Sequence, residues 1–373
     1  MIARPRSAAA AFTAEFVLSC VALFLIPLFA IPALAASGES EPDLTIYTYD
    51  TFAAKGGLGP EVLPLFEKKC ACRVRAVAAG DAGQLLTRIQ LDAERRDIRA
   101  QLVLGIDQQI WSRAKPWLEP WGKWVPRGYA AIPEKLRVEN GFLPIDYGVM
   151  TLMADMKQFR EMQVEPPRSL RDLINPAFKR NILLQDPRTS APGLGFLLFA
   201  KAVLGKDSVE FWKSLRKQWL TLTPGWDGAY ALFLKGEAPL VWSYTTSQAY
   251  HEEHGDSGDI KGRRYRALLF REGQPYQIEG AAIVRNSIRS ERQRVIARSF
   301  LEFLISREVQ TRVPLKNWML PVLSSVTIPE SFKRLPEVKK LVQTPVDPVE
   351  IKEVLSEWGR VISTGQWSTG GTR

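Results

Sequence analysis

Strand-like and helix-like segments alternate along the chain, and this alternation constrains the fold more than any other feature of the sequence. Residues 44–49 form a short run rich in β-branched and aromatic side chains, and residues 60–69 follow with apolar side chains at helical spacing. The same order returns at 73–77 and 83–95, before a third apolar run at 102–105. Strands that alternate with helices at this spacing predict a parallel sheet with crossover helices.

A second set of alternating segments begins after residue 148. A chain of 373 residues with ordinary globular composition is expected to form two domains. The sequence contains neither an internal repeat nor a low-complexity linker. We therefore expect two α/β lobes joined by strands that cross between them. The strands of this second set are expected at 149–154, 182–185, 240–244 and 276–284, and its helices at 192–204, 208–218, 226–235, 291–306 and 349–362.

Residues 1–35 are predicted to be a signal peptide rather than part of the fold. Arg4 and Arg6 precede a nearly unbroken apolar run over residues 16–36, and a small-x-small sequence ends at Ala35. An uncleaved membrane anchor is one alternative, because about 20 apolar residues can span a bilayer. A lipoprotein anchored through Cys20 is another, although the apolar stretch follows that cysteine. Two prolines near the end of the run, and the polar residues after it, favour cleavage near Ala35 and export of a soluble chain.

Cysteine and histidine are too scarce for a disulfide scaffold or a His-rich metal site, because the chain has three cysteines and two histidines. Cys70 and Cys72 remain after removal of the signal peptide. The sequence leaves open whether they form a disulfide or two free thiols. His251 and His254 have two residues between them, one fewer than the H-E-x-x-H sequence of a metalloprotease needs. We therefore expect no metal.

Motifs for catalysis and nucleotide binding are also missing from the sequence. It has no G-x-S-x-G elbow and no Walker A sequence, and Gly193 and Gly195 lack the third glycine of a dinucleotide fingerprint. Fifty basic and 40 acidic residues give a formal net charge of +10, so an anionic surface is a partner to consider. We expect no catalytic residue, no cofactor and no nucleic-acid partner.

Aromatic residues recur where strands end and helices begin. Tyr49 ends the first strand, Trp226 begins a helix, Tyr244 ends a strand with Tyr250 soon after, and Trp318 lies in a connecting segment. In an α/β sheet, the loops after the carboxyl ends of the strands line the ligand crevice. Aromatic side chains there can stack on a flat ligand or enclose a quaternary cation. Packing in the core is the alternative role for each of them.

The turn before the helix at 192–204 is a candidate anion site. Ser190 is suited to cap the helix, Pro192 is favoured in a first turn, and Gly193 lets a ligand come close. Free N–H groups at a helix start suit a phosphate, and Arg188 would help to bind it. An ordinary capped helix is the alternative.

Several short segments occur in an order that matches a known family. They are 47–52 (YTYDTF), 70–72 (CAC), 103–107 (VLGID), 146–148 (DYG), 185–190 (QDPRTS), 225–226 (GW), 234–237 (LKGE), 243–247 (SYTTS) and 317–319 (NWM). Together they resemble the periplasmic thiamine-binding proteins of bacterial ABC transporters, over about residues 44–358. The resemblance implies an α/β, two-lobed fold of the type II periplasmic-binding-protein kind, which closes on its ligand by hinge motion.

The resemblance also implies roles for individual residues. Trp226 and Tyr244 match positions that contact thiamine, and Tyr49 and Tyr250 match aromatic residues that line the same cleft. Asp81 matches an acidic residue that meets the ligand.

Further positions join the predicted ligand-binding set, and some of them depart from the family pattern. Ser190 matches a hydroxyl in the turn at the helix start, and Trp318 is included as an aromatic residue of a connecting segment. Ala82 and Ala191 stand where the family has Gly and Thr, so one hydroxyl contact to the ligand is lost. Trp242 replaces a Leu, and its side chain is expected to face the core.

The predicted function is capture of thiamine in an aromatic cleft between the lobes by the periplasmic solute-binding subunit of an ABC importer. Thiamine carries a permanent thiazolium cation and a flat aminopyrimidine, and aromatic faces near an acidic side chain would hold both. Thiamine monophosphate and thiamine pyrophosphate are expected as further ligands. The monomeric protein would deliver its ligand to the membrane permease and, through it, to the ATPase.

The resemblance and the segment pattern together predict the following division of the chain. Residues 1–35 are the signal peptide, residues 36–148 and 279–345 form a discontinuous lobe 1, residues 149–278 form lobe 2, and residues 346–373 form a C-terminal helix and a frayed tail.

Two other function classes remain open at this stage. An enzyme similar to thiaminase I shares the lobed architecture and would need a cysteine nucleophile in the cleft. Cys70 and Cys72 follow a helix rather than lying in an aromatic loop at a strand end, which argues against that class. A binding protein for another cationic solute, or for ferric ion, is the other alternative, and the single His pair argues against iron.

Overall fold

The computed structural model describes residues 41–255 and 264–363. The predicted signal peptide, with its alternatives, and the predicted frayed tail from residue 364 onward lie outside the described residues. The chain from Pro42 onward forms one compact unit, in which the whole fold described below is contained. No helix among the described residues is both long enough and apolar enough to cross a membrane.

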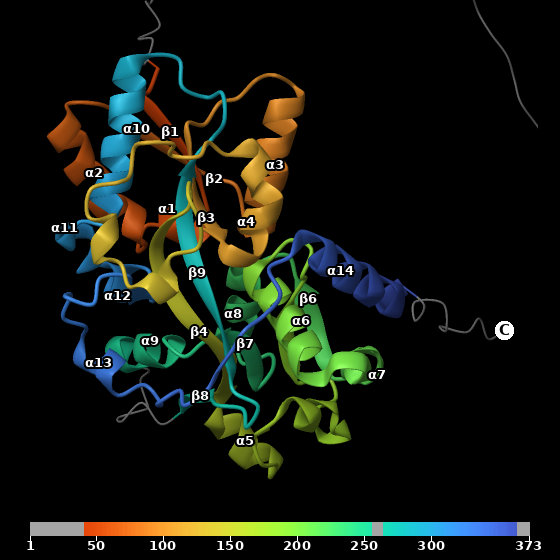
Figure 1. Cartoon of the computed structure of the whole chain (residues 1–373). Helices are drawn as coiled ribbons and strands as arrows, with labels where there is room; N and C mark the ends of the chain where they lie inside the picture. Colours follow the sequence, from red (N-terminus) through yellow and green to blue (C-terminus); the bar gives the residue numbers. More distant parts are fainter. Residues whose placement is uncertain (1–40, 256–263, 364–373) are drawn as a thin grey trace, which may run out of the picture. The chain divides into compact units, whose positions relative to one another are not determined.

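The strands form one sheet with two parallel ends and an antiparallel centre (Figure 1). Its main path runs in the order β2-β1-β3-β9-β4-β7-β5-β6. Strands β1, β2 and β3 are parallel to one another, as are β5, β6 and β7, while β9 and β4 are antiparallel to their neighbours on this path. The strands are β1 (Leu44–Thr48), β2 (Val74–Ala78), β3 (Leu102–Asp107), β4 (Leu143–Asp155), β5 (Ile182–Gln185), β6 (Trp219–Thr223), β7 (Leu240–Tyr244), β8 (Tyr265–Leu268), β9 (Gln274–Ile283), β10 (Leu320–Pro321) and β11 (Leu341–Val342).

Two long strands, β4 and β9, belong to both ends of the sheet. The first part of β4 pairs with β9, and its second part pairs with β7 and β8. Strand β9 also pairs with β3. We call β1–β3 with their helices the first lobe, and β5–β8 with theirs the second lobe. The predicted boundaries at residues 148/149 and 278/279 fall inside β4 and β9, so the division into lobes cuts through paired strands.

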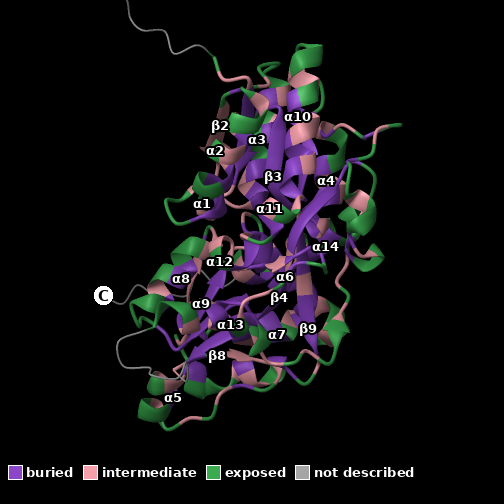
Figure 2. Ribbon diagram, turned by 90° about the vertical axis from the view of Figure 1, so that its left-hand side faces the viewer, coloured by how far each residue is buried: buried purple, intermediate pink, exposed green. Residues whose placement is uncertain are grey.

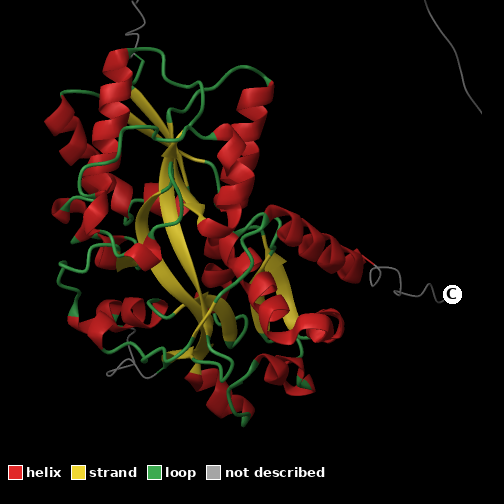
Figure 3. Cartoon of the chain, viewed as in Figure 1, coloured by secondary structure: helices red, strands yellow, loops and turns green. Residues whose placement is uncertain are grey.

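Helices cover both faces of the strands (Figure 3). In the first lobe, α2 and α10 lie on one face of the strands, and α3 and α4 lie on the other (Figure 1). The helices are α1 (Asp50–Ala53), α2 (Leu58–Cys70), α3 (Ala82–Glu94), α4 (Gln108–Ala114), α5 (Met156–Met162), α6 (Ala191–Leu204), α7 (Ser208–Leu215), α8 (Trp226–Leu234), α9 (Ser247–His254), α10 (Glu291–Leu304), α11 (Arg307–Gln310), α12 (Val313–Lys316), α13 (Glu330–Lys333) and α14 (Pro348–Ser363).

The alternation of strands and helices is confirmed, but the sequence analysis missed β6, β8 and the two short strands β10 and β11, and it did not predict that β4 and β9 are antiparallel to their neighbours in the main path. The helix expected over 208–218 ends at Leu215, because residues 219–223 form β6. The Trp-Leu-Thr-Leu-Thr sequence of β6 alternates between its two faces and packs at the edge of the sheet beside β5. The antiparallel centre arises because β9 returns to the first lobe between β3 and β4.

The apolar core follows the sheet through both lobes, and Figure 2 shows buried residues along β3, β4 and β9. Trp242 on β7 is among the largest fully buried side chains. Its indole N–H donates to the carbonyl oxygen of Pro192 at 2.9 Å, so its polar atom is satisfied inside the core. The expectation that Trp242 faces the core is confirmed.

A disulfide joins Cys70, the last residue of α2, to Cys72. The intervening Ala71 adopts a left-handed conformation with a φ of 47°, which ends the helix and turns the chain toward β2. The question that the sequence left open is therefore settled in favour of the disulfide, and neither residue is a free thiol.

Candidate ligand cleft

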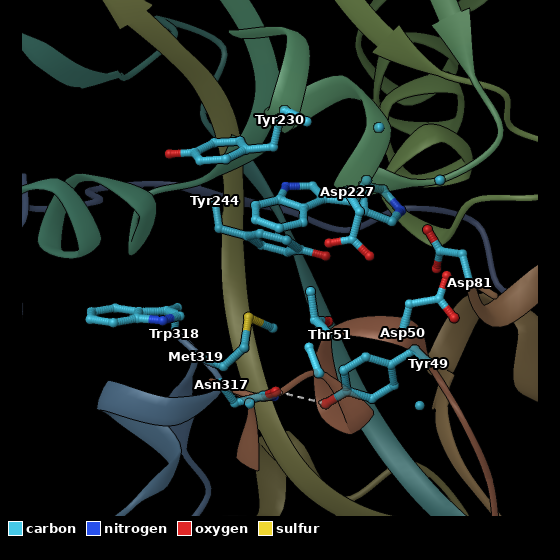
Figure 4. A pocket seen from close by; sticks show the side chains of 18 of the residues that line it. Tyr49, Asp50, Thr51, Asp81, Asp227, Tyr230, Tyr244, Asn317, Trp318 and Met319 are labelled. Carbon is cyan, nitrogen blue, oxygen red and sulfur yellow. Dashed lines mark hydrogen bonds between the residues drawn. The ribbon is translucent and has the colours of Figure 1, made fainter. Parts of the chain in front are cut away.

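A cleft of about 950 Å³ lies where the carboxyl ends of the strands of both lobes meet. Its volume falls within the range of pockets that enclose small molecules. The residues that line it come from the segments after β1, β2 and β6, from the end of β7, from α8 and α9, and from the segment between α12 and β10 (Figure 4). They include Tyr49, Asp50, Gly80, Asp81, Gly105, Trp226, Asp227, Tyr230, Tyr244, Tyr250, His254, Glu279, Lys316, Asn317, Trp318 and Met319.

Two aromatic rings of the second lobe are held in place by hydrogen bonds. Trp226 is the first residue of α8, stacks on Tyr230 with ring centroids 4.5 Å apart, and donates its indole N–H to Ser243 Oγ at 2.8 Å. Tyr244 donates its hydroxyl proton to Gln277 Oε1 at 2.8 Å. Both rings line the cleft, so their faces are oriented before any ligand arrives (Figure 4).

A second aromatic group lies at another side of the cleft. Tyr250 stacks on His254 with ring centroids 4.3 Å apart and meets Trp318 edge to face at 5.0 Å. Trp318 has a φ of 55°, an uncommon value for a bulky residue. Such strained backbone persists only where the surrounding structure fixes it, and it is concentrated at binding sites. Among the described residues, no group of three or more His, Cys, Asp or Glu side chains could hold a metal ion.

Tyr49 fills the floor of the cleft on the side of the first lobe. Its hydroxyl donates to Asn317 Oδ1 at 3.0 Å, and its ring lies against Gly105 of β3 (Figure 4). A Cβ at Gly105 would come within 2.1 Å of that ring, and the backbone φ of 104° there also requires glycine. The close approach of ring and strand thus depends on the missing side chain.

Asp81 connects the helix starts of the two lobes. It caps α3 by accepting from the backbone N–H of Ala82 at 2.7 Å, and Gln84 completes the capping box. The same carboxylate accepts from Ser190 Oγ at 2.7 Å and from the backbone N–H of Ala191 at 3.4 Å, both at the start of α6. Burial raises the pKa of Asp81, and these hydrogen bonds oppose the shift.

Three of the nine residues predicted for the site lie beside the cleft rather than in its lining. Ala82, Ser190 and Ala191 are each about 1% exposed and surround the Asp81 carboxylate. Ser190 also caps α6, as the sequence predicts, by accepting from the N–H of Gly193 at 3.4 Å. Its hydroxyl proton is given to a carboxylate, so the start of α6 already faces a negative group.

The other six predicted residues are brought together in the lining: Tyr49, Asp81, Trp226, Tyr244, Tyr250 and Trp318. Their contacts with a ligand stay a prediction. Sequence reasoning missed Tyr230, in the interior of α8, and His254, the last residue of α9, both of which line the cleft. Each lies four residues from a predicted aromatic residue, the spacing of neighbours on one helix face, and that spacing was the available signal.

Carboxylates dominate the charge of the lining. Asp50, Asp81, Asp227 and Glu279 line the cleft, whereas Lys316 is the only Lys or Arg among the described lining residues. Burial, helped by repulsion from the two neighbouring aspartates, raises the pKa of Asp227 to about 6. The ammonium group of Lys316 is 2.7 Å from a carboxylate outside the lining. The arrangement therefore attracts a cation with a flat, apolar face.

The fold and the cleft together define a class. Two α/β lobes joined by crossing strands, with a ligand-sized cavity at their strand ends, constitute the periplasmic binding protein fold. The sequence pattern of the bacterial extracellular solute-binding proteins matches residues 123–347.

Curated relatives and solved structures agree with that class. The chain is 37% identical over 341 residues to the thiamine-binding periplasmic protein of Brucella melitensis biotype 1, covering 91% of this chain and 96% of that protein. It is 38% identical over 333 residues to the protein of the same name from Escherichia coli strain K12, covering 87% and 94%. A solved periplasmic thiamin binding protein superposes with a TM-score of 0.74 at 35% identity, covering 86% of this chain and 96% of that one.

The chain belongs to the bacterial extracellular solute-binding protein family. Members of this family bind solutes rather than transform them, so membership places the chain among binding proteins and not among enzymes. A ferric binding protein from Campylobacter jejuni shares the fold with a TM-score of 0.66 at 20% identity, and that likeness shows the fold alone. The predicted α/β, two-lobed fold is thereby confirmed.

Proposed function

We propose that this protein captures thiamine in the cleft as the periplasmic solute-binding subunit of an ABC importer. The observation that carries the proposal is the lining itself, in which oriented aromatic faces stand beside four carboxylates. A thiazolium ring is both flat and permanently cationic, so it gains stacking and cation–π attraction from such a site. The names of the relatives, which are 33–38% identical to this chain, support the same ligand.

The aromatic residues of the second lobe would carry the cationic ring. Trp226 and Tyr244 present faces whose orientation is fixed by hydrogen bonds, and Asp227 lines the same cleft. Tyr250 and Trp318 would close the other side of the cleft. In a site from which water is displaced, each cation–π contact is worth about 0.5–2 kcal/mol.

Thiamine itself should be preferred to its phosphates. The start of α6, where a phosphate was expected, is occupied by the Asp81 carboxylate, and Lys316 is already paired. A phosphate group would add negative charge to a lining that holds four carboxylates. We therefore propose thiamine monophosphate and thiamine pyrophosphate as weaker ligands whose phosphates point toward solvent.

Export and delivery complete the proposed role. The relatives are named as periplasmic proteins, and residues 1–35 carry the features of a cleaved signal peptide. The mature monomer would then pass thiamine to the membrane permease and, through it, to the ATPase. Sequencing the N-terminus of the exported protein tests the cleavage site: a start near residue 36 is expected, and a retained residue 1 would contradict export by cleavage.

Calorimetric titration of the purified, ligand-free protein with thiamine tests the proposed ligand. Intrinsic tryptophan fluorescence should change in parallel, because Trp226 lines the cleft. The absence of both signals at millimolar thiamine would contradict the proposal. Titration with the two phosphates in the same buffer tests their order, and a tighter fit for the pyrophosphate would refute the electrostatic argument.

The enzyme alternative finds no support in the structure. Cys70 and Cys72 are joined to each other, and neither lines the cleft. Incubation with thiamine and an amine or thiol co-substrate should release no pyrimidine product. The ferric alternative has no observation in its favour beyond the fold that the chain shares with a ferric binding protein.

A further inference from the structure

Two carboxyl groups face each other on the strands that cross between the lobes. Asp146 of β4 and Glu279 of β9 are direct partners across the antiparallel ladder. Asp146 is fully buried, and Glu279 is partly exposed and lines the cleft. Like charges directly opposite one another in a sheet are destabilising, so this pairing calls for an explanation.

The hydrogen bonds around the pair satisfy only half of its oxygens. Asn317 Nδ2 donates to Asp146 Oδ2 at 2.7 Å, and Gln277 Nε2 donates to Glu279 Oε1 at 3.0 Å. Among the described residues, no amide, hydroxyl or basic group donates to Asp146 Oδ1 or Glu279 Oε2. Each carboxyl group thus keeps one buried oxygen without a donor, and the two side chains are opposite one another in the ladder. An ionised carboxylate only accepts, so one carboxyl group can satisfy the other only if the pair carries a proton.

The surroundings favour retention of that proton while the cleft is empty. Burial raises the pKa of both carboxyl groups, and repulsion from neighbouring carboxylates adds to the shift of Glu279. The titratable groups that act on the pair from adjoining elements are acids and phenols: Asp107 of β3, Asp81 at the start of α3, Tyr49 after β1 and Tyr244 of β7.

The basic groups near Asp146 and Glu279 interact with other carboxylates. Lys316, from α12, pairs with Glu61 at 2.7 Å. Arg113 of α4 acts on the neighbouring Asp107, whose pKa it lowers. A ligand that brings a positive charge into the cleft would therefore supply a counter-charge to Asp146 and Glu279.

We propose that Asp146 and Glu279 share one proton in the empty cleft and release it to solvent when a permanent cation binds, which makes the pair a sensor of ligand charge. The proposal rests on the cationic ligand proposed above. In the step, the O–H bond of Glu279 breaks and the proton passes to water. The pair changes its charge from −1 to −2 as the ligand contributes +1, so the total charge of the site is conserved.

This exchange sets a preference for ligands. A permanent cation offsets the second negative charge, whereas a neutral ligand of the same shape leaves the proton in place and forgoes that attraction. Cation binding should thus tighten as the pH rises through the range in which the pair titrates, and binding of a neutral isostere should not.

Calorimetry in buffers of different ionisation enthalpy measures the proton directly. Near neutral pH, the mature protein should release about one proton for each thiamine bound, because the pair holds one proton at most. In Glu279→Gln, which keeps the shape but cannot ionise, thiamine should still bind and the release should be lost. The matched control Glu237→Gln, at an exposed position after α8, should release protons as the wild type does.

The outcomes separate this proposal from the proposed function. Thiamine binding without proton release in the wild type, or with an undiminished release in Glu279→Gln, would overturn the shared proton. Absence of any binding heat would instead contradict thiamine as the ligand. Infrared spectra give a second readout: a C=O stretch of a protonated carboxyl group should be present in the empty wild type, absent from empty Glu279→Gln, and lost from the wild type on thiamine binding. Its absence from the empty wild type would also overturn the proposal.

Discussion

One substitution at Ser190 measures how much the hydrogen bond between Ser190 and Asp81, which joins the two lobes, contributes to thiamine affinity. In Ser190→Ala, Asp81 loses a 2.7 Å hydrogen bond that joins the start of α6 to the start of α3. A hydrogen bond to a charged group contributes about 1.5–3 kcal/mol. If the bond acts when the lobes close on the ligand, thiamine affinity should fall about tenfold to 150-fold, at about 1.4 kcal/mol for each factor of ten.

Ser190→Ala should also lower the folding stability, which urea unfolding measures separately from affinity. Ser190 also caps α6, through a long 3.4 Å bond from the N–H of Gly193. Loss of a helix cap costs about 0.5–2 kcal/mol of folding stability, and the length of this bond favours the low end. Urea unfolding of the empty protein should show this loss, while calorimetric titration should show the loss of affinity.

Two comparisons decide whether the reasoning holds. Ser190→Ala should weaken thiamine and thiamine monophosphate by the same factor, because its hydroxyl is given to Asp81 and does not face the cleft. A loss several-fold greater for the monophosphate would show that the helix start binds the phosphate. Ser208→Ala is the matched control, since this buried serine donates to the carbonyl of Gly205 far from the lining, and it should leave affinity unchanged. If Ser190→Ala and the wild type bind thiamine with equal affinity, the Ser190–Asp81 hydrogen bond does not contribute to ligand binding.

Three further predictions concern the cleft, its charge and the disulfide. Trp226→Ala or Tyr244→Ala should each weaken thiamine binding several-fold to about thirtyfold, measured by calorimetry, and larger losses would reflect the hole left behind. Burial raises the pKa of Asp107 to about 7, well above the value of about 3.9 for an unfolded Asp. The folded state therefore binds more protons, so thermal melts should show the empty protein gaining stability as the pH falls from about 8 to 5, and Asp107→Asn should reduce this gain. Replacing Cys70 and Cys72 together by Ser should leave thiamine affinity within a few-fold by titration, and complete loss would place them in the binding machinery.

Local sequence features predicted the elements and one cap. Helical spacing of apolar residues located α2, α3, α6 and α10 to within about two residues, because amphipathic periodicity is a property of the segment alone. Ser190 was identified as the cap of α6 on the same local grounds. Strand direction is not local, and the antiparallel course of β9 follows from where the chain returns rather than from its own residues.

Most aromatic residues of the cleft could be predicted from the sequence, but most of its acidic residues could not. Aromatic residues at strand ends pointed to it, because the carboxyl ends of parallel strands meet at one edge of a sheet. Asp50, Asp227 and Glu279 were missed, since an acidic residue in a sequence looks the same whether it faces water or a cavity. Whether they face the cleft is decided by how the lobes pack, and Asp146 becomes the neighbour of Glu279 only through the pairing of β4 with β9.

The course of β9 also sets the order in which the strands find their neighbours as the chain is synthesised. Strands β5, β6 and β7 are complete once residue 244 has been synthesised, whereas β3 gains its second neighbour only when residues 279–283 of β9 have been made. One edge of β3 therefore stays unpaired while the strands of the second lobe are synthesised, although β1, β2 and β3 come earlier in the chain. A chain halted before residue 274 would carry an unprotected edge on β3 beside an already paired β5–β7 unit, and that edge is where a chaperone would be needed before β9 is made.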